Sequence, residues 1–184
     1  NAIVLDSSAY CNCTVWMKVM EQLKELTNIR TRYFFYYDKE QMEIGIPDFK
    51  KSMGDDVFYH NVFEAWKGRG FYTAPKRNVL DNQLLSNIAK YELTCLKMLD
   101  RLDPLGESFS FTHRQYFFRD LLLVWLDIID DMDIQVVFSP DVPHKIYDYI
   151  LYVAAKIRKI EFVSFQKTPF SDSSFVLDSV DHIP

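Results

Sequence analysis

The sequence has little glycine, and none of it lies where a nucleotide-binding loop needs it. Only 5 of the 184 residues are glycine, and the segment that follows the first apolar run, residues 6–14, contains none. A dinucleotide-binding turn needs Gly-x-Gly-x-x-Gly so that its backbone can approach a pyrophosphate, and a P-loop needs Gly-x-x-x-x-Gly-Lys. Neither pattern is present, and the Gly-x-Ser-x-Gly elbow of a hydrolase is missing too. These absences argue against an NAD-dependent dehydrogenase, a P-loop NTPase and a small hydrolase.

Cysteine is also scarce. The chain has three, Cys11, Cys13 and Cys95, and an odd, sparse set predicts reduced thiols in a cytoplasmic protein rather than a disulfide framework. No second Cys or His pair stands at ligand spacing from Cys11-x-Cys13. We therefore favour buried thiols over half of a metal site.

Long apolar runs and an excess of positive charge are missing as well. The longest mostly apolar run, residues 121–129, contains Asp127 and is too short to span a bilayer. The formal net charge is −5, which offers no attraction to nucleic acid or to an anionic membrane. We expect no transmembrane segment and no nucleic-acid partner.

Apolar and aromatic residues are plentiful, and they follow strand and helix patterns. They make up 48% and 16% of the chain, respectively, which is enough for the core of one domain of this length. Short apolar runs predict strands at residues 2–5, 31–37, 134–138 and 161–165. Apolar side chains at steps of three and four predict helices at residues 15–26, 80–102, 113–131 and 145–159. A strand, a helix and a strand in succession predict a parallel pair. We therefore predict a single α/β domain over residues 1–184, a Rossmann-like three-layer sandwich with a mainly parallel sheet.

The pattern is weaker between residues 38 and 79. A short helix capped by Asp48 fits residues 48–53, and residues 57–60 fit either a strand or the start of a helix that continues to Trp66. The basic, glycine-containing segment 67–71 fits a contact for a phosphate or an acidic sugar, but we favour a solvated surface connection.

Acidic side chains gather at the end of the predicted helix 113–131. Asp127, Asp130, Asp131 and Asp133 supply the hard oxygen ligands that a divalent cation prefers. They precede the amino end of the next strand, however, which is the wrong edge of a parallel sheet for a ligand site. We favour a solvated helix end over a metal site.

The turn after residues 134–138 is the best candidate for a functional site. Parallel sheets bind ligands at the carboxyl ends of their strands, and Asp141 and His144 follow such an end. The start of a helix disfavours an imidazolium, so a neutral His144 is suited to accept a proton from a hydroxyl. Asp141 would orient the ring or act as the base itself. The alternative is that Asp141 only caps the helix and His144 is a half-exposed residue of its first turn.

Two further polar loops are expected at the same edge of the sheet. One follows residues 2–5 and the other follows residues 161–165. The candidate substrate-binding residues in these loops are Asp6, Ser7, Ser8, Lys167, Thr168 and Ser171.

Three motifs in the last third of the chain carry a resemblance to a known family. They are Ser139-Pro140-Asp141-x-Pro143-His144, Tyr147-Asp148-Tyr149-x-Leu151-Tyr152-x-x-Ala155-Lys156 and Gln166-Lys167-Thr168-Pro169. Together they resemble the amino-terminal half of bacterial surface or capsular polysaccharide glycosyltransferases of the two-domain GT-B kind. The resemblance covers mainly residues 134–171.

The resemblance implies an acceptor-side role. In such enzymes the amino-terminal Rossmann-like domain binds the acceptor and often supplies the base, whereas the carboxyl-terminal domain binds the nucleotide-sugar. By that resemblance the chain would bind a glycan acceptor, with His144 or Asp141 at the base position and with no cofactor. Nothing in the sequence resembles a donor domain. By the resemblance we therefore expect the chain to be the amino-terminal domain of a longer two-domain protein that does not turn over alone. Because its first residue is Asn1 rather than Met, we also expect the natural amino terminus to be missing.

A function from another class stays open. A non-catalytic α/β binding or protein-interaction module, with an aromatic surface that docks a partner, fits the same composition. The two hypotheses differ in whether a second α/β domain follows in the full-length protein.

Overall fold

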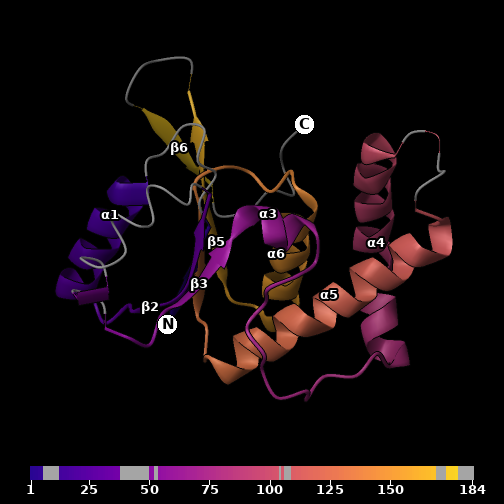
Figure 1. Ribbon diagram of the computed structural model, residues 1–184, viewed down its shortest axis with the longest axis horizontal. Coiled ribbons are helices and arrows are strands. Elements are labelled where there is room, and N and C mark those ends of the chain that lie inside the picture. Colours follow the sequence, from indigo (N-terminus) through magenta and orange to yellow (C-terminus); the bar gives the residue numbers. More distant parts are fainter. Residues whose placement is uncertain are drawn as a thin grey trace.

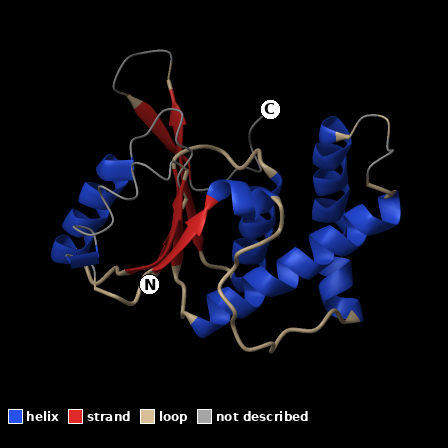
Figure 2. Cartoon of the chain, viewed as in Figure 1, coloured by secondary structure: helices blue, strands red, loops and turns tan. Residues whose placement is uncertain are grey.

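A six-stranded sheet forms the middle layer of the structure (Figures 1 and 2). The computed structural model describes residues 1–5, 13–37, 50–51, 54–103, 105, 109–168 and 173–177. The strands are β1 (Ala2–Val4), β2 (Thr31–Tyr36), β3 (Phe58–Asn61), β4 (Val136–Ser139), β5 (Glu161–Lys167) and β6 (Ser174–Leu177). Their order across the sheet is β3-β2-β1-β4-β5-β6. The first five strands are parallel, and β6 is antiparallel to β5.

Helices cover both faces of this sheet. Helix α1 (Cys13–Leu26) lies on one face, and four other described helices lie on the opposite face (Figure 1). Those on the opposite face are α3 (Val62–Trp66), α4 (Asn82–Leu102), α5 (Phe111–Asp131) and α6 (Ile146–Arg158). The predicted α/β sandwich with a mainly parallel sheet is therefore confirmed. None of the described helices is long and apolar enough to cross a membrane.

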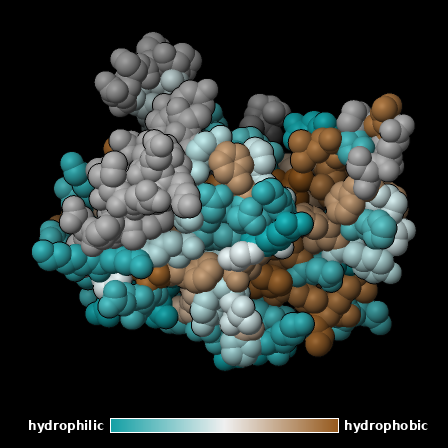
Figure 3. Space-filling model, in the orientation of Figure 1, coloured by the Kyte–Doolittle hydropathy of each residue, from teal (hydrophilic) through white to brown (hydrophobic). Residues whose placement is uncertain are grey.

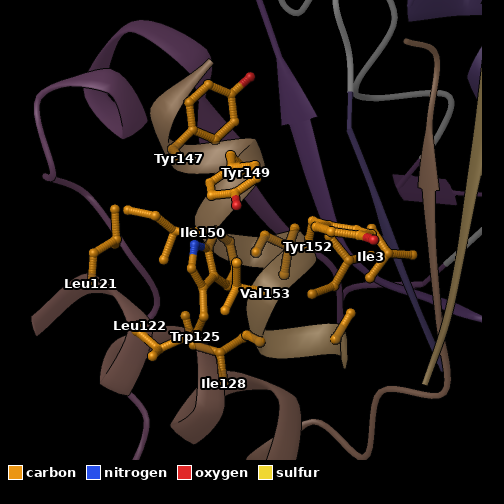
Figure 4. Close-up of a cluster of buried hydrophobic side chains, with 14 of the residues drawn as sticks. Ile3, Leu121, Leu122, Trp125, Ile128, Tyr147, Tyr149, Ile150, Tyr152 and Val153 are labelled. Atoms are coloured by element: carbon orange, nitrogen blue, oxygen red, sulfur yellow. The ribbon is translucent and has the colours of Figure 1, made fainter. Parts of the chain in front are cut away.

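Alternating side chains of the central strands divide the interior into two cores. On β2, Tyr33 and Phe35 point to the side of α5 and α6, whereas Phe34 points to α1. All three are fully buried, because a central parallel strand is covered on both faces. The larger core is built around Trp125 of α5 and Ile150 of α6 (Figure 4).

The ambiguous segment after residue 56 contains both predicted alternatives in succession. Residues 58–61 form β3, and Asn61 then caps α3 by accepting a hydrogen bond from the backbone amide of Phe63. Of the helix predicted at 48–53, the structure describes only residues 50 and 51, which are helical. Strand β6, which pairs with β5, was not predicted, because its four residues are mostly exposed and show no clear alternation of apolar and polar side chains.

The acidic residues at the end of α5 are structural, so the predicted solvated helix end is wrong for three of them. Buried Asp127 accepts hydrogen bonds from the backbone amides of Arg77 and Asn78, each at 2.9 Å. Asp130 pairs with Arg158 of α6 at 2.7 Å, and Asp131 pairs with the Arg77 guanidinium at 3.1 Å. These carboxylates fasten the long connection before α4 onto α5. Asp133, the fourth acid, is exposed.

The prediction of a buried thiol is confirmed for the one cysteine whose side chain the structure describes. Cys95 is a free, fully buried thiol in α4, and burial raises its pKa to about 12. Cys11 lies outside the described residues, and only the backbone of Cys13 is described.

Candidate functional site

A groove of about 610 Å³ lies at the carboxyl edge of the parallel strands. Strand β3 runs directly into α3, and β4 runs through residues 140–145 into α6, so both strand ends supply walls of the groove. The last turn of α4 closes the third side. The lining residues are Phe63, Trp66, Lys67, Met98, Arg101, Leu102, His144, Lys145 and Ile146. Apolar surface is concentrated on the α4 side of the molecule (Figure 3).

His144 is the titratable side chain of this groove that the sequence singled out. Its Nδ1 lies 2.8 Å from the carbonyl oxygen of Val142. A carbonyl only accepts hydrogen bonds, so Nδ1 carries the proton and the lone pair of the neutral ring lies on Nε2. The side chain is 52% exposed. A backbone contact therefore fixes the tautomer that a general base needs, and the ring stays accessible.

Asp141 lies beside His144 but does not hydrogen-bond to its ring. The distance from its Oδ2 to His144 Nδ1 is 3.8 Å, which is too long for a hydrogen bond. Its other oxygen accepts from the backbone amide of Val142 at 2.8 Å. The Val142 carbonyl thus orients the imidazole, while Asp141 supplies a nearby negative charge. The catalytic roles of both residues stay predictions.

The alternative prediction, that Asp141 caps α6, is wrong. The N-cap residue is Lys145, and it makes no side-chain capping bond. Asp148, at the third helical position, instead reaches back and accepts from the backbone amide of His144 at 3.3 Å. An acid at this position commonly bonds back to the amides that precede a helix. The signal was thus present in the sequence, seven residues after Asp141.

The carboxyl group of Asp148 is also unusual, because it is buried and its pKa is raised. Its side chain is buried, and Oδ1 has no hydrogen-bond partner among the described residues. Burial raises the pKa of this carboxyl to about 8, although the backbone amide of His144 and the positive charge of Lys145 act in the opposite direction. The turn that holds His144 is therefore tied to a carboxyl group that loses its proton only in mildly alkaline solution.

Of the other predicted site residues, the structure describes only Thr168 and the backbone of Lys167. Asp6, Ser7, Ser8 and Ser171 lie outside the described residues. In the hairpin of β5 and β6, Lys167 pairs with Ser174 along the backbone, and Thr168 donates its amide to the carbonyl of Ser173 at 3.2 Å. Thr168 does not line the groove, and its role in substrate binding stays a prediction.

Sequence reasoning missed the aromatic wall of the groove. Phe63 and Trp66 are 40% and 46% exposed, and their ring centroids lie 6.0 Å apart. The Nζ atom of Lys145 lies 5.6 Å from the centroid of the Trp66 ring, within cation–π range. Helix α3 buries Val62 and Ala65, so the two rings on its other side face outward. Two aromatic residues three positions apart on a short amphipathic helix were the available signal.

The basic segment 67–71 contributes to the groove only at its first residue. Lys67 lines the groove, whereas the carbonyl of Arg69 turns inward and lies 2.7 Å from His60 Nε2. Gly68 and Gly70 have φ values of 69° and 72°, a backbone conformation that favours glycine. Most of the segment is a structural connection, as we favoured, with one lysine directed to the site.

Metal chemistry and relatives give no further guide to this site. Within the described part of the chain, no group of three or more His, Cys, Asp or Glu side chains is placed to hold a metal ion. A comparison of the chain with protein-family models, with curated proteins and with solved structures finds no match.

Proposed function

We propose that this chain is the acceptor-binding domain of a glycosyltransferase that moves a sugar from a nucleotide-sugar to a glycan acceptor. The observation that carries the proposal is the tautomer of His144: its Nδ1 proton is committed to the carbonyl of Val142, which leaves the lone pair on Nε2, and the residue lines a groove at the carboxyl edge of the sheet. The motif resemblance in residues 134–171 supports the same assignment.

In this proposal His144 acts as the general base. An acceptor hydroxyl attacks the anomeric carbon of the donor sugar, a new C–O bond forms, and the bond from that carbon to the nucleotide diphosphate breaks. Nε2 takes the proton of the attacking hydroxyl, which is worth about 10²- to 10⁴-fold in rate. The resulting imidazolium lies near the Asp141 carboxylate, whose Oδ2 is 3.8 Å from Nδ1, and that charge stabilises it. The nucleotide-sugar would be held by a second domain outside this sequence.

The walls of the groove also suit an acceptor. Phe63 and Trp66 present exposed rings, and the apolar C–H face of a sugar ring packs well on an aromatic surface. A small, concave and mostly apolar site with a few polar groups is typical of ligand binding.

The test is the substitution His144→Ala in the full-length protein that contains this domain. Transfer should fall by about 10²-fold or more, because the hydroxyl loses its proton acceptor. Acceptor binding, measured on the same variant, should change by less than about threefold, since the groove keeps its apolar walls. His113→Ala is the matched control, because His113 is an exposed residue of α5 that does not line the groove. Unchanged turnover in the His144 variant would remove it from the mechanism.

One observation favours the non-catalytic module as a second candidate. Large apolar side chains around the turn between α4 and α5 are more than half exposed, namely Leu102, Leu105, Phe111 and Tyr116. Exposed apolar patches on a soluble domain often mark protein contacts. A chain that binds neither glycans nor nucleotide-sugars would support this alternative.

A further inference from the structure

We propose that the groove binds an anionic amphiphile, a ligand with a flexible apolar chain that ends in a phosphate. The proposal rests on the proposed function and deepens it, since it adds to the glycan acceptor, which keeps the hydroxyl that His144 deprotonates, an apolar chain attached through a charged phosphate. The juxtaposition that carries it is an apolar groove with a rim of positive charge beside His144.

The interior of the groove matches a hydrocarbon chain better than a polar body. Five of its nine lining residues are apolar or aromatic: Phe63, Trp66, Met98, Leu102 and Ile146. Methionine and leucine offer no hydrogen bonds to sugar hydroxyls, but they pack well against methylene groups. The volume of about 610 Å³ lies within the usual range for sites that enclose one small molecule.

The charge of the groove is opposite to that of the chain. The whole sequence has a formal net charge of −5, whereas the described residues that line the groove include Lys67, Arg101 and Lys145 and no carboxylate. Lys67 is partly neutralised, because its Nζ lies 2.9 Å from a carboxylate oxygen of Glu64. Arg101 and Lys145 are therefore the main groups available to a negatively charged head.

A phosphate head would be held by side chains rather than by helix amides. The start of α6 lies in the groove, but the backbone amide of His144 already donates to the buried carboxyl of Asp148. Lysine and arginine bind phosphate oxygens through charge-assisted hydrogen bonds. This arrangement predicts that neutralising a cation on the rim weakens binding without disturbing the helix.

The structure provides its own reporter for the experiment. The chain has three tryptophans; Trp66 lines the groove and is 46% exposed, whereas Trp16 and Trp125 are buried. Titration with n-decyl phosphate, below the concentration at which it forms micelles, should shift the Trp66 emission to shorter wavelength, because the decyl group displaces water from the indole ring. The shift should be lost in Trp66→Phe while calorimetry still detects binding.

The ligand series separates the two parts of the proposal. Shortening the chain to n-octyl phosphate should weaken binding by about tenfold, because each buried methylene contributes a factor of about three to four. Decanol, inorganic phosphate and decyltrimethylammonium should each bind at least about tenfold more weakly than decyl phosphate, since each lacks the apolar chain or the negative charge. Equal binding of decanol and decyl phosphate would overturn the charged-head assignment.

Charge variants locate the head. Arg101→Gln and Lys145→Gln should each weaken the binding of decyl phosphate by about fivefold. Lys97→Gln should leave this binding unchanged. Lys97 is the matched control because it is an exposed cation of the same helix that does not line the groove. An equal loss in the Lys97 variant would overturn the proposal.

The outcomes also distinguish this proposal from the proposed function. If neutral oligosaccharides bind and decyl phosphate does not, the amphiphile proposal is wrong, but the glycosyltransferase proposal is unaffected. If the full-length protein binds decyl phosphate but its transfer rate is unchanged by His144→Ala, the ligand class is supported and His144 is not the base.

Discussion

Two histidines near the carboxyl edge of the same sheet have opposite environments. His60 of β3 is 2% exposed; its Nε2 donates to the carbonyl of Arg69, and its Nδ1 accepts from the hydroxyl of Tyr33, both at 2.7 Å. His144, beyond the end of β4, makes a hydrogen bond only through Nδ1 among the described residues, and its side chain is 52% exposed. Both rings are oriented by a backbone carbonyl, and only one keeps a nitrogen available for chemistry.

Burial explains the different uses of the two rings. Burial lowers the pKa of His60, because the charged imidazolium loses its hydration there. The same cause raises the pKa of Tyr33. The ring of His60 stacks on Phe35 at 5.2 Å and meets Phe71 edge-on at 4.6 Å, so it serves as a core residue with two satisfied hydrogen bonds. A histidine is therefore a candidate base when its second nitrogen, and not only its ring, is left accessible.

The largest expected contrast is in stability. His60→Ala should lower the free energy of unfolding by about 3 kcal/mol, because it empties a packed site and leaves the Tyr33 hydroxyl and the Arg69 carbonyl without their partner. His144→Ala should change it by less than about 0.5 kcal/mol, as is usual for an exposed side chain. Urea denaturation of both variants measures the difference. Similar losses would mean that the two rings are not structurally distinct.

A smaller effect is expected from crowding the His60 ring. A Cβ atom on Gly70 would lie 3.2 Å from His60 Nε2, at a φ of +72°. Gly70→Ala should therefore cost about 2 kcal/mol from backbone strain and contact together. Gly54→Ala is the matched control, because Gly54 also has positive φ, at +95°, but a Cβ there meets nothing within 4 Å. If the two variants are equally destabilised in the same denaturation assay, the enclosure of His60 is looser than the structure shows.

The smallest effect is in the pH dependence of stability. Since the pKa of His60 is lowered in the folded state, its contribution is present above the unfolded-state pKa of about 6.5 and is lost as the pH falls below that value. His60→Gln keeps an amide donor for Arg69 but does not titrate, so the variant should lose less stability than the parent between pH 7 and pH 5.

The design of that comparison removes a second titration. The pKa of Asp148 is raised to about 8, so its contribution runs the other way: it is complete below the unfolded-state value and is lost as the pH rises through 8. Both proteins contain Asp148, and the difference between their unfolding free energies cancels it. Parallel pH profiles for the two proteins would contradict the assigned role of His60.

Prediction from sequence worked where the pattern was local and long. Helix α5 is a clear case, since its apolar stripe predicted residues 113–131 and the structure has Phe111–Asp131. The earlier start comes from Ser110, whose hydroxyl accepts from the amide of His113. Strand β6 was not predicted because its four residues, three of them exposed, carry little periodicity. The cap of α6 was predicted wrongly because its N-cap position is a lysine.

The groove illustrates what local patterns omit. Its walls come from three segments, around residues 63–67, 98–102 and 144–146, and no spacing in the sequence relates them. His144 was identified because it follows a strand end in a parallel sheet. Trp66 and Arg101 were not identified, because only the packing of α3 and α4 beside α6 places them there.

By itself the sequence determined the α/β layers and the parallel pairing of strands that a helix connects, because hydrophobic periodicity and chain connectivity act over a few residues to a few tens. Only the tertiary structure decided that His60 is buried and that His144 is exposed. That distinction depends on hydrogen-bond partners and neighbours from distant segments, Tyr33 and Arg69 around His60 and the walls of the groove beside His144. Burial and the free lone pair of a side chain exist only once those segments have packed together.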